Sequence, residues 1–92
     1  MATFSNLENV RVLIVAEDPL ARAGIAALLA TQRGCVIAGR IAVDAELVNA
    51  QSVYRPDVIV WDLGSDPSRA LERTIGVRDL GVPMVALLPG ET

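Results

Sequence analysis

Two continuous runs of apolar residues constrain the fold of this chain more than any other feature. They are Val-Leu-Ile-Val-Ala at 12–16, directly after Arg11, and Val-Ile-Val-Trp at 58–61, directly after Asp57. A short apolar run without alternation, bounded by turn residues, is typical of a strand that is buried on both faces of a parallel sheet. Acidic residues follow both runs, Glu17 and Asp18 after the first and Asp62 after the second. We therefore expect two buried strands that each end in carboxylates.

The rest of the chain alternates between helix and strand patterns. Pro19 suits the first turn of a helix, and Gly34 is expected to end that helix. Gly39 weakens the next strand and favours a place near the sheet edge, and Asp44 can cap the second helix. The expected strands are 11–16, 35–41, 57–62 and 83–88, and the expected helices are 19–33, 45–53 and 68–80. This alternation predicts an α/β three-layer sandwich, a flavodoxin-like doubly wound parallel sheet with strand order 2-1-3-4.

Composition limits the kinds of function that the chain can carry. Its 92 residues suit one small domain, and 52% of them are hydrophobic, enough for a core. The net charge of −3 argues against direct binding of nucleic acid by these residues. All eight basic residues are arginine, so lysine or histidine catalysis and histidine metal sites are excluded within this chain. We expect Cys35 to be a buried free thiol.

The apolar runs are too short for a membrane protein of the helical kind. None approaches the roughly 20 residues of a membrane-spanning helix. Residues 1–9 lack the basic start and apolar stretch of a signal peptide. We therefore expect a cytoplasmic protein without a membrane partner, in which residues 1–9 are an N-terminal extension and residues 10–92 form the domain.

The three acidic residues at the strand ends form the candidate site. In an open parallel sheet, ligands bind in the crevice beyond the carboxyl ends of the strands. If the two strands are neighbours, Glu17, Asp18 and Asp62 converge, and such a cluster either takes up a proton or holds a cation. Oxygen-only ligands suit Mg²⁺. Two local interpretations compete, because Asp18 can be a helix N-cap and Asp62 can be a turn residue.

These residues resemble those of a known family, the receiver domains of bacterial two-component response regulators. Residues 11–29 are similar to the start of that domain, and Pro-Leu-Ala-Arg-Ala-Gly at 19–24 resembles its LuxR/NarL-type branch. Residues 55–63 (Arg-Pro-Asp-Val-Ile-Val-Trp-Asp-Leu) resemble the strand that carries the phosphoacceptor. The resemblance extends over about residues 10–88, with its two motifs in the expected order and spacing.

The resemblance implies a role for each acidic residue. Asp62 matches the aspartate that accepts a phosphoryl group from a histidine kinase, and Glu17 and Asp18 match the pair that binds Mg²⁺ together with it. It implies a signalling protein rather than an enzyme, which would act on DNA only through an output domain outside these residues.

Three positions depart from the family pattern. The family has Ser or Thr at the end of its fourth strand, where Leu87 and Leu88 stand here. It also has a lysine at the end of a fifth strand, and both that lysine and that strand are missing from these residues. Leu63-Gly64-Ser65 replaces the Met-Pro that follows the phosphoacceptor. The expectation is therefore a receiver that is truncated or degenerate after its fourth strand.

Two other functions stay open. The first is a pseudo-receiver that acts as an interaction or dimerisation module without phosphorylation, which Leu88 favours. The second is a nucleotide-binding half-domain, which is disfavoured because no Gly-x-Gly-x-x-Gly or Walker-type loop follows the first strand.

The fourth strand is an apolar edge strand in the expected order, and such an edge is a template for pairing with another chain. We therefore expect a homodimer or higher oligomer, through edge pairing, exchanged elements or packed helices.

Overall fold

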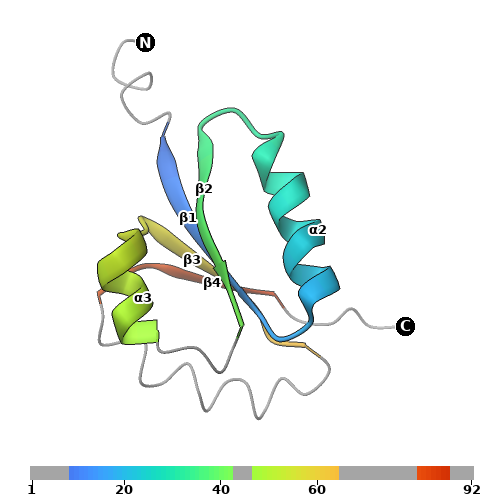
Figure 1. Ribbon diagram of the computed structural model, residues 1–92. Coiled ribbons are helices and arrows are strands. Elements are labelled where there is room, and N and C mark those ends of the chain that lie inside the picture. The colour runs from blue at the N-terminus through green and yellow to red at the C-terminus, as the bar shows by residue number, and fades with distance from the viewer. Residues whose placement is uncertain (1–8, 43–46, 65–80, 88–92) are drawn as a thin grey trace.

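A parallel sheet organises the part of the chain that the structure describes. The computed structural model describes residues 9–42, 47–64 and 81–87. The strands are β1 (Val10–Ala16), β2 (Cys35–Ile41), β3 (Val58–Asp62) and β4 (Met84–Leu87). They are arranged in the order β2-β1-β3-β4 and every neighbouring pair is parallel (Figure 1). The predicted strand order is confirmed.

One helix covers each face of the sheet. Helix α2 (Pro19–Ala30) and helix α3 (Leu47–Tyr54) lie on opposite sides of the strands (Figure 1). Successive side chains of β1 pack on opposite faces of the sheet. Ile14 packs with Ala26 of α2, and Val15 packs in one cluster with Ala50 of α3. The chain therefore has the predicted three-layer, flavodoxin-like arrangement. Within the described residues, no helix is long and apolar enough to cross a membrane.

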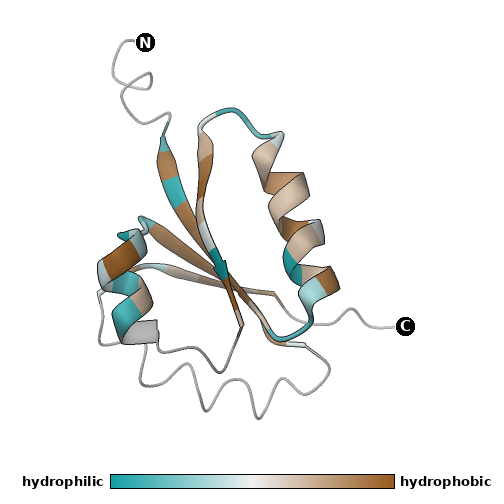
Figure 2. Ribbon diagram, viewed as in Figure 1, coloured by the Kyte–Doolittle hydropathy of each residue, from teal (hydrophilic) through white to brown (hydrophobic). Residues whose placement is uncertain are grey.

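The centre of the sheet forms the core. Residues 12–16 of β1 are at most 3% exposed, and Ile59 and Trp61 of β3 are fully buried. Figure 2 shows the apolar character of both central strands. Complete burial of one such large side chain stabilises the fold by roughly 2 kcal/mol. Within the part of the chain that the structure describes, the buried indole N–H of Trp61 has no hydrogen-bond partner.

Helix α2 ends earlier than the sequence suggested. Its last residue is Ala30, so the predicted end at Gly34 is wrong. Thr31 ends the helix, because its hydroxyl donates a hydrogen bond of 2.7 Å to the carbonyl of Leu28. Gly34 instead has φ 92°, a left-handed conformation that turns the chain into β2.

Gly39 has a packing role beyond its place in an edge strand. Strand β2 is at the sheet edge, as predicted. A Cβ atom at Gly39 would lie 2.7 Å from ring atoms of Tyr54, the last residue of α3. Real side chains do not approach so closely, so glycine is what lets this end of α3 pack onto the strand.

Smaller differences concern element ends and the thiol. Strand β3 begins at Val58, one residue later than predicted, and Cys35 is a half-buried free thiol rather than a buried one. Cys35 opens an edge strand, which limits how fully it can be covered. Three predictions lie outside the described residues: the Asp44 cap, the helix at 68–80 and the strand position of Leu88.

Candidate functional site

The two acidic segments are neighbours at the carboxyl edge of the sheet. Ala16, the last residue of β1, pairs with Asp62, the last residue of β3. Glu17 and Asp18 therefore leave β1 at the level where β3 ends, one strand spacing of about 4.8 Å away. The helices that flank these two strands also lie on opposite faces of the sheet: α2, which follows β1, covers one face, and α3, which precedes β3, covers the other. Ligands of open α/β sheets bind at such a switch point.

The carboxylates of Asp18 and Asp62 both accept local hydrogen bonds. Asp18 Oδ1 accepts the N–H of Leu20 at 3.0 Å and caps helix α2. Asp62 Oδ1 accepts the N–H of Gly64 at 3.2 Å, in a turn where Gly64 has φ 71°. Both local interpretations of these residues are thus confirmed. These two hydrogen bonds leave acceptor positions free on both side chains, because a carboxylate has about four such positions.

The three acidic side chains do not form a metal cluster in this structure. Asp62 is half-buried, whereas Glu17 and Asp18 are exposed. Among the residues described, no three acidic or thiol side chains gather closely enough to hold a metal ion. The structure therefore brings together the strand ends that carry these residues, and the oxygen-only set suits Mg²⁺ by chemistry rather than by a preformed cage.

Trp61 lies beside the site through its backbone alone. Its side chain belongs to the core cluster on the α3 side of the sheet, where it is fully buried with Leu13 and Val15. Its backbone pairs with that of Val15 and directly precedes Asp62. Since it is the only tryptophan of the chain, its fluorescence reports on this part of the core.

Arg22 is a residue of this region that the sequence interpretation missed. Its Nη1 donates a hydrogen bond of 2.8 Å to the carbonyl of Ala16, and a longer one of 3.5 Å reaches the carbonyl of Glu17. Side chains of a helix lean towards its N-terminus, so an arginine four residues after Asp18 can reach back to the strand end. That spacing was the available signal.

The neighbouring strand places an apolar residue beside Asp62. Asp62 pairs with Leu87 of β4, and the carbonyl of Leu87 accepts the N–H of Leu63 at 3.0 Å. Leu87 is 37% exposed. The described end of β4 therefore carries no hydroxyl group next to the candidate phosphoacceptor, in line with the departure noted in the sequence.

Comparison with known proteins does not place the chain in a family. No family model matches it, and neither the curated proteins nor the solved structures include a significant match.

Proposed function

We propose that this chain is the receiver domain of a response regulator, in which Asp62 accepts a phosphoryl group from a histidine kinase. The observation that carries the proposal is the pairing of Ala16 with Asp62, which sets Glu17 and Asp18 beside the end of β3. In the reaction, a carboxylate oxygen of Asp62 would attack phosphorus. A phosphorus–oxygen bond would form as the phosphorus–nitrogen bond of the kinase phosphohistidine breaks, and the leaving imidazole would take up a proton.

The surroundings of Asp62 suit an acceptor that a partner protein must reach. The buried side chains of Ile59 and Trp61 fix the strand that carries it, and Asp62 itself is half-buried. A rigid strand end holds a reacting group more precisely than a loop does. Mg²⁺ held by Glu17, Asp18 and Asp62 would offset the negative charges of the carboxylate and the phosphoryl group.

The proposal includes how the signal would leave the domain. The chain would act in the cytoplasm, and phosphorylation would change its contact with a DNA-binding output domain outside these residues. The chain itself would be a signalling module and not an enzyme.

A small phosphodonor tests this proposal. Incubation with acetyl phosphate and Mg²⁺ should add one phosphoryl group, which intact-mass measurement detects. Asp62→Asn should abolish the addition, whereas Asp57→Asn, just before the same strand, should retain it. We expect slow or incomplete reaction, because these residues contain no lysine to offset charge on the transferring group. No added mass in a full-length protein, while a control receiver is labelled in parallel, would contradict the proposal.

The second candidate is a pseudo-receiver that acts by self-association. The observation in its favour is the apolar character of β4, the edge strand beside Asp62. Val85 is 49% exposed and Leu87 is 37% exposed. An apolar edge with unpaired backbone groups is a template for pairing with another chain. On this proposal the protein is a homodimer or higher oligomer through β4, and phosphorylation is not required.

Sedimentation at micromolar concentration tests the association. The unmodified chain should sediment as a dimer or larger species. Val85→Lys should shift it towards the monomer, because a charged side chain opposes apolar edge pairing. Val53→Lys is the matched control, since Val53 is 72% exposed on α3 and its neighbour Tyr54 packs against Gly39 of β2, the opposite edge strand. A stable monomer of the unmodified chain would contradict this second candidate.

A further inference from the structure

Two arginines line a cavity at the start of helix α2. This cavity of about 250 Å³ is bounded by Pro19, Arg22 and Ala23 of the helix and by Arg40 of β2. Among the described residues, no acidic side chain lines it. Its volume is below the roughly 300–1,000 Å³ of pockets that hold drug-sized ligands, so it suits a small group rather than a whole cofactor.

Both guanidinium groups have hydrogen-bonding capacity to spare. Nη1 of Arg22 is anchored to the carbonyl of Ala16, which leaves most of its five N–H donors for other partners. Arg40 is exposed, and within the described part of the chain its side chain makes no hydrogen bond or ion pair. Two like charges that line one small cavity repel each other unless an anion lies between them. The chain as a whole is acidic, with a net charge of −3, so this concentration of positive charge is local.

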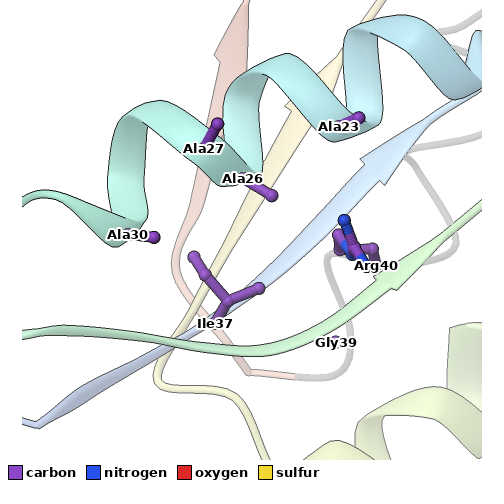
Figure 3. A pocket seen from close by; sticks show the side chains of 7 residues that line it. All are labelled: Ala23, Ala26, Ala27, Ala30, Ile37, Gly39 and Arg40. Atoms are coloured by element: carbon purple, nitrogen blue, oxygen red, sulfur yellow. The ribbon is translucent and has the colours of Figure 1, made fainter.

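The cavity continues into an apolar groove. The groove, of about 420 Å³, lies between α2 and β2 and shares Ala23 and Arg40 with the arginine cavity. Its other apolar walls are Ala26, Ala27, Ala30 and Ile37. Figure 3 shows Ile37 and Arg40 on the side of β2 that faces the four alanines of α2. The charged and apolar spaces are therefore contiguous.

We infer that this surface binds a small amphipathic anion, namely a phosphate monoester with an apolar body. The phosphate group would lie between Arg22 and Arg40, whose planar guanidinium groups match phosphate oxygens in paired hydrogen bonds. The apolar body would lie along the alanines of α2. The N-terminus of α2 does not carry the inference, because the carboxylate of Asp18 already accepts the Leu20 N–H there.

This binding is independent of phosphorylation at Asp62. Arg40 pairs with Ile14 on the far side of β1 from β3, so β1 separates its strand from the strand of Asp62. Arg22 is held near that strand end by the backbone carbonyls of Ala16 and Glu17, which a change of the Asp62 side chain leaves in place. Asp62→Asn should therefore leave ligand binding unchanged, and the failure of one proposal can be told from the failure of the other.

The test is a titration of the full chain with 1-naphthyl phosphate and with inorganic phosphate, followed by amide chemical shifts at constant ionic strength. We expect saturable shifts at residues 19–23 and 39–41 with both ligands, and tighter binding of naphthyl phosphate. Arg40→Gln should weaken both ligands about tenfold, because one of two charged contacts is lost. Arg33→Gln, at an exposed arginine outside both cavities, should change neither.

A second variant tests the groove separately. Ala27→Leu keeps a good helix-forming residue at an exposed position but fills the groove. It should weaken naphthyl phosphate and leave inorganic phosphate unchanged. The inference is overturned if neither ligand gives saturable shifts, if Arg33→Gln acts like Arg40→Gln, or if Ala27→Leu affects both ligands equally.

Discussion

The two ends of the sheet use charged residues differently. At the amino end, the carboxylate of Asp57 accepts the backbone N–H of Arg11 at 2.8 Å, and the Arg11 guanidinium donates at 2.6 Å to the carbonyl of Tyr54. At the carboxyl end, Asp62 accepts one bond within its own turn, and the exposed side chain of Glu17 makes no hydrogen bond within the described residues. Charges at the amino end therefore fasten β1, β3 and α3 together. At the carboxyl end Arg22 fastens α2 to β1, but the carboxylates keep acceptor capacity for a ligand.

The largest expected effect is on the amino end. Asp57→Ala should lower the free energy of unfolding by about 1.5 kcal/mol, because it removes a charged acceptor from a backbone N–H of the central strand. Asp62→Ala should lower it by only about 0.5 kcal/mol, since the bond that it removes lies within a turn. Urea unfolding followed by Trp61 fluorescence measures both. Equal losses for the two variants would remove the distinction between the ends.

A smaller loss is expected when Arg11 is truncated. Arg11 donates to the carbonyls of Tyr54 and Arg55, at the C-terminal end of α3. A cation there satisfies carbonyls that the helix leaves without partners. Arg11→Ala should therefore cost about 1 kcal/mol in the same unfolding measurement. Arg33→Ala serves as the control with a change near zero, and a similar loss for that variant would show that general charge, not these bonds, matters.

The smallest expected effect is a gain in stability. Arg55 follows α3 with φ 48°, a left-handed conformation that glycine adopts without strain. Arg55→Gly should raise the free energy of unfolding by about 0.5 kcal/mol, because relief of strain exceeds the entropy that glycine loses on folding. Thermal unfolding measures the shift. A clear loss of stability would mean that the Arg55 side chain has a structural role of its own.

The fold was largely predictable because its strongest signals are local. Continuous apolar runs identified β1 and β3. Strand β1 is buried on both faces as expected, whereas β3 is fully buried only on the face of Ile59 and Trp61 and half-buried on the other. The end of α2 was predicted incorrectly because both Thr31 and Gly34 can end a helix. Thr31 comes first in the chain, and its hydroxyl binds the carbonyl of Leu28, so the helix ends before Gly34 is reached. The need for glycine at position 39 was also missed, since it depends on Tyr54, which is distant in sequence.

The candidate site was predictable in position but not in detail. Alignment of the strand ends follows from the parallel order that the sequence indicates. The N-cap role of Asp18 and the turn role of Asp62 were both indicated by the sequence, and the hydrogen bonds from Leu20 and Gly64 bear them out. The sequence did not show that the acidic side chains of the described residues would stay too far apart to form a metal cluster. The cavity between Arg22 and Arg40 requires α2 to be packed against β2, so it can be recognised only in three dimensions.

A magnesium titration followed by backbone amide shifts tests the central claim, that the carboxyl end of the sheet is the ligand-binding end. We predict saturable shifts at residues 16–18 and 62–64 at millimolar Mg²⁺, and a change in Trp61 emission. Mn²⁺ should bind similarly, because a loose oxygen-only site discriminates poorly between these ions. Asp18→Asn should weaken the response, and the amides of Arg11 and Asp57 at the other end should not move. Unchanged shifts at residues 16–18 and 62–64 under saturating Mg²⁺, or equal shifts at both ends, would contradict the claim.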